Sequence, residues 1–168
     1  MKYLSGLFFC LAFLAVASSA GAEVPIEKVF VTGPRSVSLP FEVSSQGQLF
    51  TTIRVSGRAL KMLIDTGGAN TSLDRDVAIN LGIKPEGGIR AIAVGGAVVD
   101  DIAAHADIAM AEFLVHQSPI RLLDLSGTKK ALKEAGFESF DGIIGIDLLL
   151  FLRARIDLGH RMLQLYRP

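Results

Sequence analysis

Residues 63–71 read LIDTGGANT, and the only acidic residue in this stretch, Asp65, comes directly after two apolar residues. The apolar pair ends an alternating segment that predicts a β-strand, and Gly67 and Gly68 allow a tight turn right after the carboxylate. A turn of this kind holds a carboxylate in one orientation while the strand behind it is buried. Asp65 is therefore the first candidate for a functional residue.

The tripeptide Asp65-Thr66-Gly67 is weak evidence by itself, because short motifs of this kind also occur in ordinary surface turns. Its context is more informative. Residues 49–55 and 59–64 flank a Ser56-Gly57-Arg58 turn, and the second segment alternates between two faces. This pattern predicts a β-hairpin that delivers the chain to Asp65.

Two further features follow in the chain. Residues 89–94 and 97–102 predict a second hairpin with the tip Gly95-Gly96, and the apolar triplet Ile143-Ile144-Gly145 comes near the end. With these features in this order, residues 49–165 resemble the retropepsin-like aspartic proteases, the single-lobe family that includes the retroviral enzymes. The resemblance implies a mostly β fold, a closed retropepsin-like (acid protease) barrel with one or two short helices.

The same resemblance implies roles for individual residues, with Asp65 as the catalytic carboxylate. The residues implied to support the active-site loop are Thr66, Gly67, Ile143, Ile144 and Gly145. Thr66 would form its hydrogen bond across a dimer. The residues implied to contact substrate are Gly67, Ala69, Asn70, Gly95 and Gly96, the last two at the tip of a closing flap. Ala69 and Asn70 stand where the retroviral enzymes place acids, and Gly68 replaces the usual alanine, so substrate preference is expected to differ.

Hydrolysis of a peptide bond by this route needs two carboxylates that share one proton around a water molecule. The sequence contains a single Asp-Thr-Gly. We therefore expect the second carboxylate to be Asp65 of a partner chain in a homodimer that acts on a peptide or protein substrate, with no cofactor and no metal. The alternative is a non-catalytic peptide-binding or interaction module on the same fold.

Short helices are predicted over 75–81, 129–135 and 147–151. The first would have Thr71 and Asp74 as a capping pair and would end at Gly82. The second would begin at a Thr128 cap and end at Gly136.

Edge strands are predicted over 29–31 and 37–43, because Pro34 and Pro40 interrupt them. Strands are also predicted near 104–110 and 114–123, with Pro119 marking an edge or a bulge. Residues 153–157 and 161–166 predict a last hairpin around Gly159. The resemblance implies that strand 162–166 belongs to the sheet that joins two protomers.

The N-terminal segment has the pattern of a secretory signal peptide. An apolar run over 4–16 follows Lys2, and the small residues Ala20-Gly21-Ala22 predict cleavage after Ala22. The expected divisions are a signal peptide over 1–22, an N-terminal extension with edge strands over 23–48, and the protease domain over 49–168. We expect an exported protein, periplasmic or secreted, with no stable membrane partner after cleavage. An uncleaved N-terminal membrane anchor is the alternative.

Composition excludes other classes. Seventeen Lys and Arg residues balance seventeen Asp and Glu residues, which argues against a nucleic-acid partner. The single cysteine, Cys10, lies in the signal segment. The three histidines lack a metal-binding spacing, and no Gly-x-Ser-x-Gly motif is present.

Asp141, which precedes Gly142-Ile143-Ile144-Gly145, is interpreted as a structural carboxylate at a turn rather than as a second catalytic acid.

Overall fold

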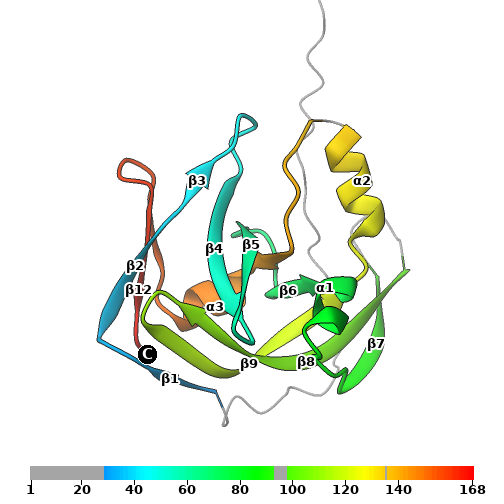
Figure 1. The fold of residues 1–168 in the computed structure, drawn as a ribbon, viewed down its shortest axis with the longest axis horizontal. Coiled ribbons are helices and arrows are strands. Elements are labelled where there is room, and N and C mark those ends of the chain that lie inside the picture. The colour runs from blue at the N-terminus through cyan, green and yellow to red at the C-terminus, as the bar shows by residue number, and fades with distance from the viewer. Residues whose placement is uncertain (1–28, 93–97, 135) are drawn as a thin grey trace, which may run out of the picture.

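The computed structural model describes residues 29–92, 98–134 and 136–168. Within them the chain forms twelve strands and three short helices (Figure 1). The strands are β1 (Phe30–Thr32), β2 (Ser36–Pro40), β3 (Glu42–Val43), β4 (Leu49–Val55), β5 (Arg58–Ile64), β6 (Ser72–Asp74), β7 (Gly87–Ile92), β8 (Val98–Met110), β9 (Phe113–Leu123), β10 (Gly142–Ile144), β11 (Arg155–Asp157) and β12 (Met162–Tyr166). The helices are α1 (Arg75–Asn80), α2 (Ser126–Glu134) and α3 (Ile146–Phe151).

Six of the strands close into a barrel. Their order is β9-β6-β10-β5-β4-β8, and β8 pairs with β9 to complete the ring. The strands β1, β7 and β3 extend the barrel at β9, β8 and β4. The predicted mostly β, closed barrel is confirmed. It has three short helices, at the three places predicted from the sequence, where the resemblance implied one or two.

The hairpin predicted before Asp65 is present as β4 and β5. The pairing runs from Val55 opposite Arg58 to Leu49 opposite Ile64. Alternate residues of β4 are buried at 53 and 55 and exposed at 52 and 54, which matches a strand with one face toward the core. The register therefore places Asp65 immediately beyond the paired end of the hairpin.

A second sheet joins the two ends of the described chain. Its order is β11-β12-β2, so β12 has a neighbour on each side from its own chain. Leu163 lies opposite Leu39 and Leu165 opposite Val37, and all four side chains are buried. The N-terminal extension is thus an integral part of the fold. The implied role of strand 162–166 between protomers stays a prediction.

The single strand expected over 37–43 is divided in two. β2 pairs with β12, whereas β3 pairs with β4 in the barrel. Phe41 lies between them, is buried, and donates its N–H to the carbonyl of Arg161 at 3.0 Å. The prediction of one continuous strand was wrong, because the chain passes from one sheet to the other at this residue.

The helix caps differ from the predicted ones. Asp74 alone is the N-cap of α1, where its Oδ1 accepts the N–H of Asp76 at 2.9 Å, and Thr71 bonds elsewhere. Helix α2 begins at Ser126, so Thr128 lies inside it, and Asp124 accepts the Ser126 N–H at 3.0 Å. The glycines that end the two helices, Gly82 and Gly136, have φ of +70° and +82° and were predicted correctly.

The second hairpin is present as β7 and β8, paired from Gly87 opposite Ala103 to Ile92 opposite Val98. Its predicted tip, Gly95-Gly96, lies outside the described residues. Pro119 lies within β9 opposite His105, and a register irregularity occurs nearby between Ala106 and Ile108. The predicted tail hairpin is present as β11 and β12.

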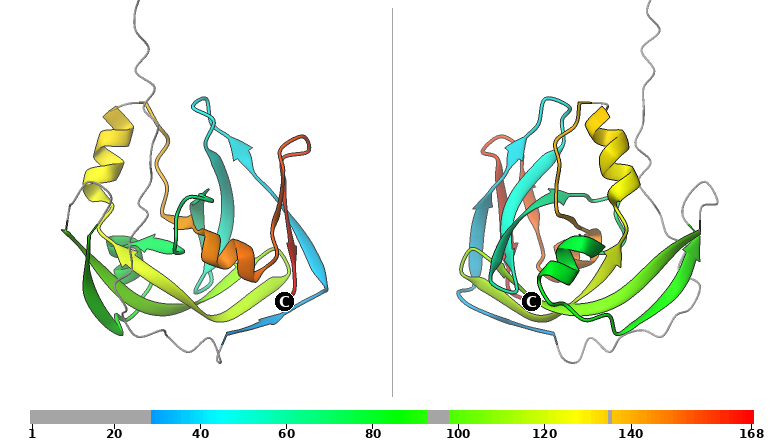
Figure 2. Two further views of the ribbon diagram at one scale, coloured as in Figure 1. Left: turned by 180° about the vertical axis from the view of Figure 1, so that it is seen from behind. Right: turned by 45° about the vertical axis from the view of Figure 1, so that its right-hand side comes forward.

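Buried apolar residues form two clusters. The larger one fills the barrel and continues under β2 and β12. The smaller one lies under α2 and consists of Phe50, Leu63, Leu125, Leu132, Phe140 and Ile143. Figure 2 shows α2 and β7 on the opposite side of the barrel from β2 and β12. Of the helices in the described part of the chain, none has the length and apolar character needed to cross a membrane.

Candidate active site

Asp65 begins the loop that connects β5 to β6. Its N–H donates to the carbonyl of Ile144 at 3.0 Å, so the residue is attached to β10 at the point where β5 ends. Strand β10 lies between the two strands that flank the loop, parallel to β5 and antiparallel to β6. The triplet Ile143-Ile144-Gly145 therefore lies directly against the Asp65 loop.

The two oxygens of the Asp65 carboxylate have different surroundings. Oδ1 accepts the N–H of Gly67 at 2.9 Å, and the Asp65 carbonyl accepts the N–H of Gly68 at 3.2 Å to close the turn. Oδ2 is buried and has no hydrogen-bond partner among residues 29–92, 98–134 and 136–168. A buried acceptor without a donor is unfavourable.

The glycines after Asp65 approach its carboxylate closely. A Cβ atom at Gly67 would lie 3.3 Å from Oδ1, and one at Gly68 would lie 3.3 Å from Oδ2. Both distances are tight but within reach of small shifts. The backbone at Gly67 and Gly68 therefore packs closely against the Asp65 carboxylate.

Two glycines of the neighbouring segment are required by packing. A Cβ atom at Gly145 would lie 2.4 Å from the carbonyl carbon of Asn70, and one at Gly142 would lie 2.4 Å from the carbonyl oxygen of Ser72. Both contacts are with backbone and cannot be relieved by a rotamer change. Close approach of β10 to the loop therefore depends on these two residues.

A second carboxylate, Asp147 in the first turn of α3, holds the far end of the loop. It accepts the N–H and the hydroxyl of Thr71, each at 2.8 Å, and the N–H of Leu148 at 2.7 Å. Thr71 in turn accepts the N–H of Gly145 at 3.2 Å, and Ile146 donates its N–H to the Gly68 carbonyl at 2.8 Å. The sequence did not predict this network, because Asp147 lies 76 residues after Thr71.

The other predicted site residues lie on the same loop or outside the described part. Thr66 is exposed, and Ala69 and Asn70 are half-buried. The Asn70 carbonyl accepts the hydroxyl of Ser72 at 3.0 Å. Gly95 and Gly96, the predicted flap tip, cannot be placed relative to Asp65, since they fall in the undescribed segment. The roles assigned to all these residues stay predictions.

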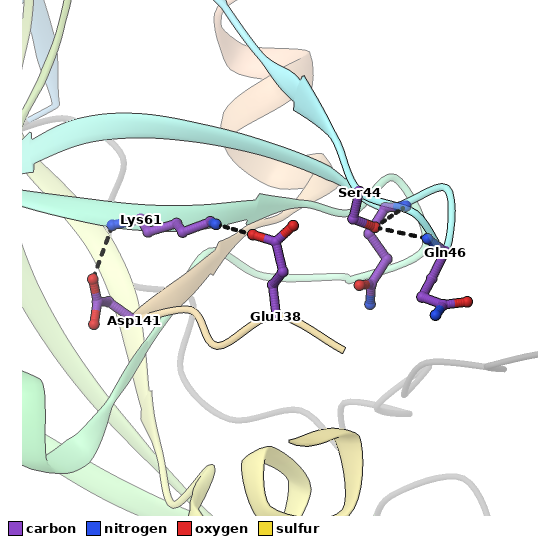
Figure 3. A network of polar contacts seen from close by, with 6 residues as sticks. Ser44, Gln46, Lys61, Glu138 and Asp141 are labelled. Atoms are coloured by element: carbon purple, nitrogen blue, oxygen red, sulfur yellow. Dashed lines mark hydrogen bonds and ion pairs between the residues drawn. The ribbon is translucent and has the colours of Figure 1, made fainter. Parts of the chain in front are cut away.

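Asp141 has a structural environment. Its Oδ2 accepts the Lys61 N–H at 2.9 Å, its own N–H donates to the Lys61 carbonyl at 2.7 Å, and its carbonyl accepts the Asp74 N–H at 2.9 Å. Figure 3 shows Asp141 beside the backbone of Lys61, whose ammonium group pairs with Glu138. This carboxylate links β5 to the segment before β10, as expected for a turn residue.

Each histidine of the sequence lies beside a carboxylate. His105 contacts Glu86 at 2.6 Å, His160 contacts Asp157 at 2.8 Å, and His116 lies 3.6 Å from Asp107. The three pairs lie at separate places on the strands and their connecting turns. None of the contacts found for them within the described residues involves the Asp65 loop.

The chain was compared with known protein families, curated proteins and solved structures. A family model described as aspartyl protease matches residues 51–148, more than half of the chain. A search of curated proteins finds no match.

Solved structures with a similar fold include a retropepsin-like aspartic protease from Rickettsia conorii, which is 16% identical with a TM-score of 0.49 over 83% of this chain and 93% of that chain. The retroviral protease-like domain of Ddi1 from Leishmania major is 19% identical with a TM-score of 0.49, covering 70% of this chain and 87% of that chain. The EIAV protease in complex with the inhibitor HBY-793 is 17% identical with a TM-score of 0.47, covering 70% of this chain and 99% of that chain.

Proposed function

Because the chain belongs to the aspartyl protease family, we propose that it is an endopeptidase whose active site is assembled from Asp65 of two identical chains. The proposed reaction is hydrolysis of a peptide bond by a water molecule that the two carboxylates hold and activate. The substrate is a peptide or a protein, and the alternative function is peptide binding without catalysis.

One observation carries the proposal. The Asp65 carboxylate is fixed by the Gly67 N–H through Oδ1, while Oδ2 is buried without a donor among the described residues. Asp147 and Asp141, by contrast, each accept backbone hydrogen bonds that hold segments together. Among these three carboxylates, Asp65 is the one with a buried oxygen that lacks a donor among the described residues.

The chemistry follows from placing two such groups together. Two carboxylates near one another cannot both be ionised at low cost, so the pair retains one proton. The ionised member takes a proton from water, which attacks the scissile carbonyl, while the protonated member donates a hydrogen bond to that carbonyl oxygen. A proton shared between the two Oδ2 atoms would form a hydrogen bond that joins them, in place of the partner that Oδ2 lacks among the described residues.

The sequence supports the participation of a second chain. One Asp-Thr-Gly occurs in 168 residues, and the barrel is a single lobe. A two-fold dimer places the same residue of each chain at the axis, so one motif per chain is sufficient. Thr66, which is exposed beside Asp65, is available for the proposed hydrogen bond to its counterpart.

The test is cleavage of a peptide library by the protein lacking residues 1–22, compared with the Asp65→Asn variant, from acid to neutral pH. We expect cleavage by the wild type and at least a thousandfold loss in the variant, because an amide cannot act as the general base. Activity per chain should rise with protein concentration as dimers form.

Retained cleavage in Asp65→Asn would refute the assigned role. No cleavage at any pH by a folded monomer would instead favour the peptide-binding module. The circular dichroism spectrum of each protein establishes that it is folded before either conclusion is drawn.

We further propose that the protein is exported, on the strength of the signal-like pattern over residues 1–22. Mass spectrometry of the protein purified from its natural host gives the N-terminus directly. A chain that begins at Glu23 would support export with cleavage, and a chain that begins at Met1 would support the membrane-anchored alternative.

A further inference from the structure

Three buried side-chain atoms in the described part of the chain lack a hydrogen-bond partner: Asp65 Oδ2, Gln48 Oε1 and Arg75 Nε. Arg75 belongs to α1, whereas Gln48 directly precedes β4. Leaving a buried acceptor without a donor costs about 1–3 kcal/mol. Two such acceptors at the ends of paired strands therefore indicate a missing donor.

The register places Gln48 next to Asp65. Leu49 pairs with Ile64, so continuing the antiparallel register by one step sets Gln48 across from Asp65. The preceding pair on the same face is Phe50 opposite Leu63, both buried in the cluster under α2. On this face the apolar pair Phe50–Leu63 separates Thr52 opposite Lys61 from residues 48 and 65. Side chains directly opposite one another on a face are neighbours.

The backbone of Gln48 is fixed by the turn before β4. Its N–H donates to Ser44 Oγ at 3.1 Å, and its carbonyl accepts the Ser44 N–H at 2.9 Å. Ser44 Oγ also accepts the N–H of Gln46 at 3.3 Å, as Figure 3 shows. These hydrogen bonds fix the backbone from which the Gln48 side chain extends.

The proposed dyad supplies a partner for Asp65 Oδ2 but none for Gln48 Oε1. A side-chain amide has both a donor and an acceptor, the same pair of groups that a peptide unit presents. We propose that Gln48 is a substrate-binding residue whose Oε1 accepts a backbone N–H of the peptide beside the scissile bond. This inference rests on the proposed function, because it assumes that the peptide lies over Asp65.

The experiment compares wild type with Gln48→Met, which keeps the length of the side chain and removes its amide. Gln46→Met is the matched control, since Gln46 is an exposed residue of the same turn. The substrate is a library peptide that the wild type cleaves, used together with analogues that carry one N-methyl group at each successive backbone position. We measure kcat and KM separately for every pair of protein and peptide.

We expect Gln48→Met to raise KM about tenfold with little change in kcat, and Gln46→Met to stay within twofold of wild type. One N-methyl position should cost the wild type about tenfold in kcat/KM and cost Gln48→Met less than threefold. The effects of this N-methyl group and of Gln48→Met are then not additive, and the methylated position identifies the N–H that donates to Gln48.

Other results would overturn the inference. If Gln48→Met cleaves like wild type while Asp65→Asn is inactive, the proposed function stands and the role of Gln48 is wrong. A weaker dimer with unchanged KM, seen by sedimentation at several concentrations, would place Gln48 at the protomer interface instead. Absence of cleavage by the wild type would overturn both proposals together.

Discussion

Asp65 begins the loop between β5 and β6, whereas Asp147, in α3, contacts the far end of this loop at Thr71, and the two carboxylates have opposite surroundings. Asp147 receives the N–H and hydroxyl of Thr71 and the N–H of Leu148. Asp65 receives one N–H, from Gly67, and buries its second oxygen without a donor from the described residues. Asp147 therefore stabilises the loop through its hydrogen bonds, whereas Asp65 keeps one oxygen without a donor among the described residues.

The largest change in stability is expected from Gly145→Ala, because Gly145 packs against the loop that begins at Asp65 and is held by Asp147. The new Cβ atom would lie within 2.8 Å of three backbone atoms of Asn70 and Thr71, so β10 must move away from the loop. We expect the free energy of unfolding to fall by at least about 3 kcal/mol. Urea denaturation followed by circular dichroism measures it, and a loss below about 1 kcal/mol would show that the loop adapts.

Replacing Asp147 by Ala should cost about 3 kcal/mol, because the buried hydroxyl and N–H of Thr71 lose their acceptor. Asp65→Asn, in contrast, should leave the free energy of unfolding within about 1 kcal/mol of wild type, since its carboxylate contributes one hydrogen bond. The same urea titrations distinguish the two variants. Equal losses in the free energy of unfolding would show that Asp65 contributes as much to stability as Asp147.

Asp141→Ala is expected to have a smaller effect, about 1–2 kcal/mol, because its side chain accepts a single N–H, from Lys61. Asp141→Asn should recover most of this loss, since the amide oxygen can accept the same hydrogen bond. Peptide cleavage by both variants should remain within a few-fold of wild type. A thousandfold loss of cleavage by a stable Asp141→Asn protein would reassign Asp141 to the chemistry.

The smallest effect concerns Asp124, before α2. Hydrogen bonds from the Ser126 hydroxyl and N–H lower the pKa of this carboxyl from its ordinary 3.8. A lowered pKa in the folded state means that ionised Asp124 stabilises the protein above about pH 4 and that this contribution is lost as the pH falls through the folded-state pKa. Melting temperatures between pH 5 and pH 2 should therefore fall slightly more for wild type than for Asp124→Asn. Parallel curves would show that the hydrogen bonds do not favour the ionised form.

The sequence predicts local structure well in this chain. The hairpin before Asp65 follows from alternation and a turn signal, and Gly82 and Gly136 end their helices because glycine tolerates a positive φ. The environment of Asp141 also agrees with its interpretation as a turn carboxylate.

Features that depend on distant residues were not predictable from local patterns. Thr71 was assigned to the cap of α1, since nothing nearby shows that Asp147, 76 residues later, would accept its hydroxyl. The division of strand 37–43 at Phe41 likewise depends on β12, at the other end of the chain. Gln48 attracted no attention in the sequence, because its position across from Asp65 emerges only from the register of β4 and β5.

The pairing of β2 with β12 has a consequence for the timing of maturation. Ser36 lies opposite Tyr166, so the second sheet closes only after β12 has been made. Such long-range closure is slow to form compared with local hairpins. A chain still emerging from a ribosome or a translocation channel would expose Val37 and Leu39 without a partner and would lack the completed fold. The second sheet therefore forms only when β2 and β12, which are far apart in the sequence, have come together.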